Sequence, residues 1–340
     1  MRATIKDVAK AAGVSPSTVS LVLNRKPVPI TRETRERVLR AAESLHYRPN
    51  QLAVGLVTNT TNTVGVILPD SNNPYFAALS NELEVRLRKE HLNVIIGNTG
   101  FDPEVTRQYL RIFSDRRVDG IVLAQLDFED PAETASCRTL LEQIDLPVVL
   151  VDQVGSGRDH VAVAVDQVRA GYLAGQHLLK LGHRRIGCAA GSMALEVNRE
   201  RYRGFCQALE EFHLTPDPDL LCCGELSLDW GRQALPRLAE QHVTALFAFN
   251  DMIAYGVYQA ARDLHLSIPR DLSVVGVDDI PFSDIIHPPL ATVAQPVHLM
   301  ALHTVESLLQ LLGKAEGQPQ STVLRPELMV RGSTAPLFIQ

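Results

Sequence analysis

The stretch that decides the fold of the first fifty residues is Ile5-Lys-Asp-Val-Ala-Lys-Ala-Ala-Gly-Val-Ser-Pro-Ser-Thr-Val-Ser-Leu-Val-Leu-Asn24. Thr4, with Asp7 three residues later, matches a capping box and predicts that a helix begins there. Gly13 permits a sharp turn, and Ser15 can cap a second helix that starts with proline. Two such helices are too small to form a core alone, but the second fits the major groove of DNA. The pattern therefore indicates a helix-turn-helix.

Charge is distributed unevenly along the chain. Residues 1–59 contain ten Lys and Arg against four Asp and Glu, a net charge of +6, whereas the whole chain carries −6 and the remainder therefore −12. A basic head on an acidic body is expected of a DNA reader attached to a soluble sensor. Charge alone does not separate DNA binding from simple solvation of a small helical domain. Together with the caps and the turn, it favours DNA binding.

Length and composition describe a globular protein of two or three domains, with 340 residues of which 45% are hydrophobic. No apolar run is long enough to cross a bilayer, and the N-terminus does not read as a signal peptide. We therefore expect a cytoplasmic protein with no membrane partner.

The five cysteines lack metal-ligand spacing and are expected to be reduced, so no metal or cofactor is predicted. A strained redox pair at Cys222 and Cys223 is the less favoured alternative to two partly buried thiols at a strand end.

The head is expected to contain three helices between residues 4 and 46. The third opens at Thr31 and carries four apolar side chains on one predicted face, namely Val38, Leu39, Ala42 and Leu45. A short segment over residues 51–57 follows, too short to be a stable helix alone. A polar linker over residues 58–63 then leads into the body.

From Val64 onward, buried-strand runs alternate with helical stretches in two successive rounds. This rhythm predicts an α/β body of two doubly wound parallel-sheet lobes with helices on both faces. We expect a DNA-binding domain with a hinge helix over residues 1–60 and an effector-binding and dimerisation domain over 61–340. The lobes are expected to be discontinuous, about 61–160 plus 294–322 and about 161–293 plus 323–340.

Motifs in a fixed order along the whole chain resemble the LacI/GalR family of transcription regulators. They include Tyr47-Arg-Pro-Asn50, Asn73-Pro-Tyr-Phe76, Arg117-Val-Asp-Gly120, Gly182-His-Arg-Arg-Ile186, Arg201-Tyr-Arg-Gly-Phe205, Asn250-Asp251, Val275-Gly-Val-Asp-Asp279 and Gln295-Pro296. The resemblance implies a homodimeric DNA-binding repressor whose body is similar to periplasmic sugar-binding proteins and closes on a small effector. Tetramers in this family use a C-terminal heptad segment. The end of this chain has no heptads, so a dimer is expected.

The resemblance also assigns DNA contacts. Base-reading positions fall on Pro16, Ser17 and Leu21, and backbone contacts fall on Thr4, Ser15, Thr18, Ser20, Asn24 and Asn50. The chain departs from the family at Leu21, where Arg is frequent and would bind guanine. Leu21 either touches a thymine methyl group or packs against the third helix, and the sequence leaves both open. Leu56 matches the residue that two protomers wedge into the minor groove, and Gly55 beside it weakens the hinge helix.

The effector site is expected between the lobes, at the carboxyl ends of the strands. Asp152, Asn250 and Asp278 each follow or end a predicted strand, so their side chains should lie there. The resemblance adds four further residues to this site, namely Arg201, Asn73, Tyr75 and Phe76. A guanidinium with carboxylates and an amide suits the hydroxyl groups of a sugar. The alternative is that Arg201 and Asp278 form a plain interlobe salt bridge.

Two other classes of protein compete with a regulator. An enzyme on a doubly wound sheet would need a phosphate-binding glycine motif or a catalytic cluster, and neither is found, so no catalytic residue is predicted. A transport-type binding protein would need export and would have no DNA-binding head. We therefore expect a repressor of carbohydrate-metabolism genes controlled by a sugar or sugar derivative. The sequence leaves ribose, galactosides, gluconate, trehalose and purines open as effectors, and Leu226, in place of a family aromatic, favours a smaller or less planar one.

Overall fold

The computed structural model describes residues 3–23, 29–47, 60–153 and 160–337. The chain divides into two compact units, a head over Met1–Thr61 and a body over Asn62–Gln340. Each unit is described by itself below. The hinge predicted over residues 51–57 lies outside the described residues, as do Asn24 and Asn50.

Three helices form the head, α1 (Ile5–Ala12), α2 (Pro16–Leu23) and α3 (Arg32–Ser44). The predicted capping box at α1 is present, because the Asp7 carboxylate accepts hydrogen bonds of 2.8 Å from both the backbone N–H and the hydroxyl of Thr4. The Ser15 hydroxyl caps α2 by accepting from the Thr18 N–H at 3.1 Å. Gly13 makes the turn between them with a φ of +64°, a conformation that few other residues adopt without strain.

A small apolar core holds the head together. Val8, Val19 and Val38 are fully buried at its centre. The face predicted for the third helix was partly wrong, because Leu39 and Leu45 are 47% and 36% exposed and the buried residues of α3 are Val38, Ala41 and Ala42. Three short helices bury only a narrow stripe of α3, and these two leucines lie beside that stripe.

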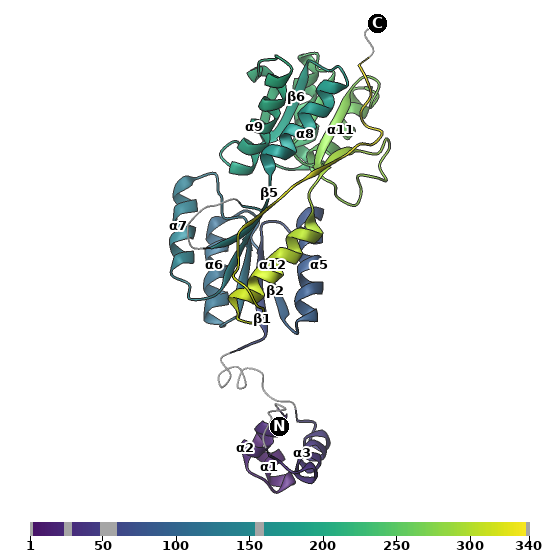
Figure 1. The fold of residues 1–340 in the computed structure, drawn as a ribbon. Coiled ribbons are helices and arrows are strands. Elements are labelled where there is room, and N and C mark those ends of the chain that lie inside the picture. Colours follow the sequence, from purple (N-terminus) through teal and green to yellow (C-terminus); the bar gives the residue numbers. More distant parts are fainter. Residues whose placement is uncertain (1–2, 24–28, 48–59, 154–159, 338–340) are drawn as a thin grey trace. The chain divides into compact units, whose positions relative to one another are not determined.

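The first lobe is a six-stranded parallel sheet in the order β11-β5-β4-β3-β1-β2. Helices α5 and α12 pack together on one face, and α6 and α7 pack together over a second cluster of apolar side chains that includes Phe113 and Leu141 (Figure 1). The strands are β1 (Thr63–Leu68), β2 (Asn93–Asn98), β3 (Gly120–Ala124), β4 (Val148–Val151), β5 (Val161–Val165) and β11 (Thr322–Leu324). The helices are α5 (Pro74–Lys89), α6 (Pro103–Asp115), α7 (Pro131–Glu142) and α12 (Val297–Leu311).

The second lobe repeats the plan with the order β12-β10-β9-β8-β6-β7, in which only the β10–β12 pair is antiparallel. Helices α8 and α9 pack against each other, as do α10 and α11. The strands are β6 (Ile186–Gly191), β7 (Leu221–Gly224), β8 (Ala245–Ala248), β9 (Ser273–Asp278), β10 (Ala291–Ala294) and β12 (Glu327–Met329). The helices are α8 (Gln167–Lys180), α9 (Glu196–Glu211), the 3₁₀ turn η1 (Pro218–Leu220), α10 (Leu228–Glu240) and α11 (Asp251–Asp263).

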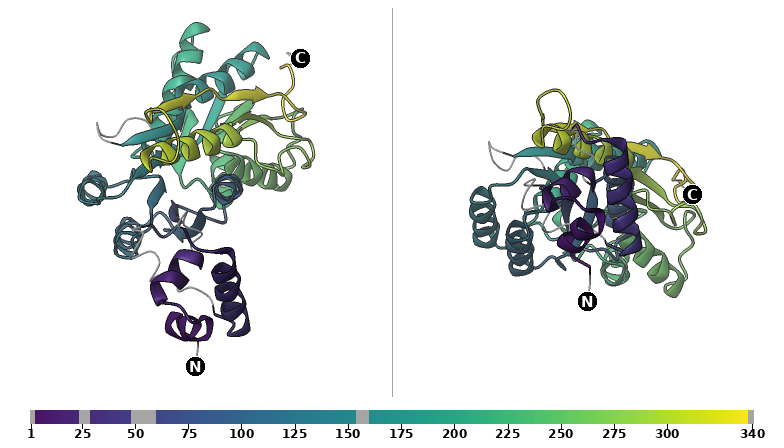
Figure 2. Two further views of the ribbon diagram at one scale, coloured as in Figure 1. Left: turned by 60° about the horizontal axis from the view of Figure 1, so that its bottom comes forward. Right: turned by 90° about the horizontal axis from the view of Figure 1, so that it is seen from below.

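The chain crosses between the lobes three times, after β5, after β10 and after β11. Figure 2 shows the late segment, α12 with β11 and β12, running along both lobes. Each sheet is built from segments that are not contiguous in the sequence, and the boundary predicted near residue 160 comes before β5, a strand of the first sheet. Strand β5 belongs to the first sheet because it pairs with β4, with Leu150 opposite Ala162. Strand β11 pairs with the other side of β5 and forms the edge of this sheet.

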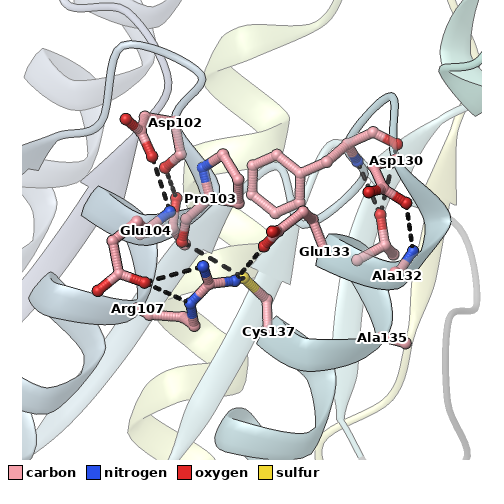
Figure 3. A network of polar contacts seen from close by, with 12 residues as sticks. Asp102, Pro103, Glu104, Arg107, Asp130, Ala132, Glu133, Ala135 and Cys137 are labelled. Atoms are coloured by element: carbon pink, nitrogen blue, oxygen red, sulfur yellow. Dashed lines mark hydrogen bonds and ion pairs between the residues drawn. The ribbon is translucent and has the colours of Figure 1, made fainter.

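A polar clamp joins α6 to α7 in the first lobe (Figure 3). The Arg107 guanidinium donates to Glu104 on its own helix at 2.9 Å and to Glu133 on α7. It also lies 3.6 Å from the Cys137 sulfur, and the Cys137 thiol in turn faces the Pro103 carbonyl at 3.5 Å. The clamp therefore fixes the position of α7 against α6.

The five cysteines are free thiols, as predicted. Cys223 is exposed at the end of β7 beside the half-buried Cys222. No helix in the described ranges is long and apolar enough to span a membrane.

Candidate functional site

The carboxyl ends of strands from both sheets face one cleft between the lobes of the body. Asp152 follows β4 in the first lobe, whereas Asn250 follows β8 and Asp278 ends β9 in the second. All seven residues that the sequence pointed to line this cleft, namely Asn73, Tyr75, Phe76, Asp152, Arg201, Asn250 and Asp278. Within each sheet the parallel strands end at a common edge, and the cleft lies where these edges of the two sheets face each other.

The first lobe contributes an aromatic wall to the cleft. The Asn73 side chain caps α5 by accepting from the Tyr75 N–H at 3.0 Å, which fixes the start of that helix at the cleft. Tyr75 is 3% exposed and contacts Phe76 edge-to-face, with ring centroids 5.0 Å apart. Burial, then the negative charge of Asp152, raises the pKa of Tyr75 well above its usual value. Its hydroxyl therefore keeps its proton and can donate a hydrogen bond.

Arg201 lies at the centre of the second lobe's wall. Its Nε donates to the Gln167 amide oxygen at 2.8 Å, and its Nη1 donates to the Phe249 carbonyl. Its Nη2 lies 3.9 Å from Asp278 Oδ1. The guanidinium is 3% exposed, so these partners are what make its burial tolerable.

Close packing of α8 on α9 puts Arg201 within reach of Gln167. A Cβ added at Gly171 would lie 1.8 Å from the Arg201 carbonyl oxygen, and one at Gly204 would lie 1.8 Å from the Val168 carbonyl oxygen. Only glycine permits this approach between the two backbones. The pair of glycines is therefore part of how the site is built.

Two glutamines extend the network across the lobes. Gln167 Nε2 donates to Asp152 of the first lobe at 3.2 Å and to the Gln295 amide oxygen at 3.0 Å. Gln295 Nε2 donates to Asp278 Oδ1 at 2.7 Å. The sequence left open an interlobe salt bridge between Arg201 and Asp278. Their ion pair does not join the lobes, because both residues belong to the second lobe. One hydrogen-bonded connection between the lobes instead runs from Gln167 to Asp152.

Two of the three cleft aspartates, Asp152 and Asp278, are held in unusual backbone conformations. The φ angle is +60° at Asp152 and +119° at Asp278. Non-glycine residues rarely adopt positive φ, and each such residue costs about 1–3 kcal/mol. Strain of this kind persists only where the surroundings impose it, and it is concentrated at ligand-binding and catalytic sites.

Burial sets the protonation behaviour of the cleft. It raises the pKa of Asp152 and of Asp278, and the positive charge of Arg201 opposes the shift in both. Burial also raises the pKa of Glu200, near the N-terminus of α9, and the nearby negative charge of Glu196 raises it further. Added negative charge is therefore unfavourable in this cleft.

Sequence reasoning missed several lining residues. Phe101, Gln125, Asp127, Arg138 and Gln153 come from the first lobe, and Gln167, Glu196 and Glu200 from the second, with Gln295 at a crossing. Gln295 was quoted within a family motif, and Gln125 and Gln153 directly or nearly follow buried strands, so the strand-end argument could have included them. Arg138 lies in the third turn of α7, and no local sequence pattern identifies it as a cleft residue.

The first lobe supplies the cap for a helix of the second lobe. Leu195, the N-cap residue of α9, has an apolar side chain and makes no cap hydrogen bond. Asp127 Oδ2 instead accepts from the Glu196 N–H at 2.6 Å. A carboxylate at a helix N-terminus is favoured by the helix dipole as well as by the hydrogen bond. Asp127 and α9 therefore bind each other across the cleft.

The head presents the start of α2 to solvent. Pro16 and Ser17 are exposed, and Leu21 is half-exposed and is not among the apolar side chains that pack against the head core. Of the residues expected at backbone-contact positions, Thr4 and Ser15 are exposed, whereas Thr18 and Ser20 are half-buried. Asn24, Asn50 and Leu56 lie outside the described residues.

Comparison with known proteins bears on both units. Residues 4–50 match the family model for bacterial regulatory proteins of the lacI family, and residues 175–334 match that for a periplasmic binding protein-like domain. The transcriptional regulator DegA of Bacillus subtilis is 35% identical over 341 residues, which covers 99% of both chains. The chain belongs to the LacI family.

Solved structures of LacI-family regulators share the whole architecture. The lac repressor dimer bound to operator and the anti-inducer ONPF aligns over 98% of this chain and 100% of that one, with a TM-score of 0.86 and 26% identity. The regulator CelR in complex with cellobiose aligns over the same shares, with a TM-score of 0.72 and 28% identity. This LacI-family chain is thus a DNA-binding transcription regulator and not an enzyme.

Proposed function

We propose that this LacI-family regulator is a repressor of carbohydrate-metabolism genes, and that a sugar or sugar derivative bound between the lobes controls its binding to operator DNA in the cytoplasm. The observation that carries the proposal is the cleft network, in which Arg201, Gln167, Asp152, Gln295 and Asp278 join both lobes. A ligand that contacts this network changes the free energy of lobe closure directly.

The chemistry of the lining favours a ligand rich in hydroxyl groups. Carboxylates accept hydrogen bonds and the guanidinium group donates them, whereas a side-chain amide can do both. A sugar hydroxyl needs one donor and one or two acceptors nearby, and this set supplies both kinds. The apolar faces of Phe76 and Phe101 line the same cleft and suit the C–H face of a sugar ring.

We also propose that the working form is a homodimer. Exposed apolar side chains lie at the edge strand β2, where Ile95 and Ile96 are 39% and 47% exposed, and after β9, where Phe282 and Ile285 are 51% and 71% exposed. Large exposed apolar side chains are typical of protein contacts. Sedimentation of the wild type and of an Ile96→Asp, Ile285→Asp double variant measures the assembly. The wild type should sediment as a dimer and the variant as a monomer.

Gel-shift titration tests operator binding. The promoter fragments adjoining the gene are titrated with the full chain, with random DNA of equal length as control. A pseudo-palindromic site should be bound at least a thousandfold more tightly than random DNA. Equal affinity for the two would contradict a sequence-specific repressor.

Thermal-shift screening tests the effector site, because a ligand that binds only the folded protein raises its apparent stability. A sugar that stabilises the body should alter operator affinity in the gel shift. Asp278→Ala and Arg201→Ala should keep operator binding and lose this response. Asp219→Ala, which removes an exposed carboxylate of the same lobe, is the matched control and should respond as the wild type does. A wild-type response in the Asp278 variant would exclude the cleft as the effector site.

A further inference from the structure

More acidic than basic side chains line the cleft. Among the described residues that line it, five bear carboxylates, whereas only Arg138 and Arg201 bear positive charge and none is Lys or His. The carboxylates are those of Asp127, Asp152, Glu196, Glu200 and Asp278. Like charges in a partly buried site repel each other far more strongly than in water, because the effective dielectric constant is lower.

Arg201 is already partly engaged by the protein's own groups. Its Nε, Nη1 and Nη2 are directed at Gln167, the Phe249 carbonyl and Asp278 respectively. A phosphate or carboxylate at this guanidinium would compete with Asp278 and Gln167 for it, and displacing either would leave a buried polar group without a partner.

The helix N-termini at the cleft are occupied as well. Such N-termini are ready-made anion sites, because their N–H groups have no partner within the helix. Here Asn73 caps α5 at Tyr75 N–H and Asn250 caps α11 at Ile253 N–H. The N-terminus of α9 is filled by the Asp127 carboxylate. The protein's own groups therefore occupy these positions.

The hydrogen-bonding groups that remain open include a donor and an acceptor on one side chain, which suit a hydroxyl group. Within the described part of the chain, Arg138 Nε and both amide atoms of Gln153 are buried at the cleft and have no hydrogen-bond partner. Gln153 thus offers a donor and an acceptor on one side chain. A hydroxyl group pairs with both, whereas an ionised phosphate or carboxylate only accepts.

We propose that the cleft selects an uncharged, polyhydroxylated effector and rejects the phosphorylated or carboxylated form of the same molecule. The inference rests on the proposed function, since it specifies the ligand of that site. It removes sugar phosphates and sugar acids such as gluconate from the candidate effectors and keeps uncharged sugars. The acids Glu196 and Glu200, on the first turns of α9, are the residues that set this selectivity.

The experiment compares matched ligands on the full-length protein. Ribose is paired with ribose 5-phosphate, glucose with glucose 6-phosphate and gluconate, galactose with galactose 6-phosphate, and trehalose with trehalose 6-phosphate, in a thermal-shift screen followed by calorimetric titration. The uncharged member that binds best should bind at least 100-fold more tightly than its anionic partner. The Glu196→Gln, Glu200→Gln double variant should reduce that ratio about tenfold. Glu210→Gln, an exposed site on the same helix, should leave it unchanged.

The outcomes separate the two proposals. If an anionic member binds as tightly as its uncharged partner and Asp278→Ala abolishes its binding, the charge selectivity is wrong and the effector cleft stands. If a sugar binds with unchanged affinity to Asp278→Ala, the cleft assignment itself fails. If no member of the panel binds while operator binding is intact, both the carbohydrate assignment and the selectivity are contradicted.

Discussion

Leu21 is a position at which the head departs from the family pattern, and the sequence left two roles open for it, contact with DNA or packing on the third helix. It is half-exposed on α2 and does not belong to the apolar set packed on the head core, whereas Leu23 does. A side chain in that position is free to meet a thymine methyl group in the major groove.

We predict that Leu21→Ala weakens specific operator binding about fivefold, close to 1 kcal/mol, because one apolar contact is lost. Binding to random DNA and the unfolding free energy of the head should not change. Fluorescence anisotropy on the two DNAs and thermal melting measure these quantities. Leu39→Ala, at an exposed leucine of α3, serves as the control. A loss of head stability without a loss of specificity would instead support packing.

His183 illustrates a residue whose role is structural. Its Nε2 lies 3.1 Å from the Ala335 carbonyl oxygen, which can only accept, and its Nδ1 lies 2.9 Å from the Thr244 hydroxyl. The neutral ring with the proton on Nε2 satisfies both contacts. Burial lowers the pKa of His183 below its usual value of 6.5. The ring therefore holds the C-terminal segment against the second lobe in its uncharged form.

This shift predicts a pH dependence of stability. Because the pKa is lower in the folded state, the unfolded chain binds the proton first, and stability falls as the pH drops below about 6.5. Denaturant unfolding of the wild type and of His183→Gln between pH 8 and pH 5 should show a stability difference that shrinks toward acid. His213→Asn, at an exposed histidine, should follow the wild-type profile at all pH values. A constant difference would refute the assignment.

At the scale of elements, the clamp between α6 and α7 holds the helix that carries Arg138 (Figure 3). Arg107 is 13% exposed at its side chain and joins Glu104 and Glu133 at once. Its pKa is raised mainly by the hydrogen bond to Glu133. The planar guanidinium is suited to two partners in a way that an ammonium group is not.

We predict that Arg107→Ala lowers the unfolding free energy by about 1–2 kcal/mol, since it removes charge-assisted hydrogen bonds that are only partly screened by solvent. Arg107→Lys should recover less than half of the loss. Arg111→Ala, whose exposed side chain lies 3.7 Å from Glu104, should stay within about 0.5 kcal/mol of the wild type. Urea denaturation followed by circular dichroism gives all three values, and equal effects of Arg107→Ala and Arg111→Ala would refute the clamp.

The hinge over residues 51–57 stays a prediction from the sequence alone. Gly55→Ala favours a helix and should tighten operator binding by up to roughly 1 kcal/mol. Leu56→Ala should weaken specific binding far more than binding to random DNA, because the minor-groove wedge is lost. Anisotropy titrations with both DNAs test the pair. The hinge assignment is wrong if neither change alters specific affinity.

At the scale of the whole molecule, the basic head and the acidic body set the dependence of DNA binding on salt. Ten Lys and Arg in residues 1–59 of each protomer, doubled in a dimer, release counterions when they meet phosphates. A plot of log affinity against log salt should have a slope on the order of −5 or steeper. Titrations from low to physiological salt measure it. A slope near zero would contradict a DNA-binding surface built from these charges.

Local patterns were sufficient wherever neighbours in sequence make the structure. The caps at Thr4 and Ser15 and the turn at Gly13 were predicted because their hydrogen bonds join residues at most three or four apart. Strand ends placed Asn250 and Asp278 at one edge of the second sheet and Asp152 at the corresponding edge of the first for a similar reason, since parallel strands share their direction. The family motifs added Arg201 and the residues at the start of α5.

Only the tertiary structure decided which of these groups meet. Gln167 contacts Asp152 and Gln295, and Asp127 caps α9 from 69 residues away. No local sequence pattern predicts contacts between residues so far apart in the chain. Sheet order was equally hidden, because a buried strand such as β5 is apolar on both faces and can join either sheet. Residue type and spacing determined the parts and their caps, whereas the direction of each side chain in the cleft depends on packing between segments far apart in the chain.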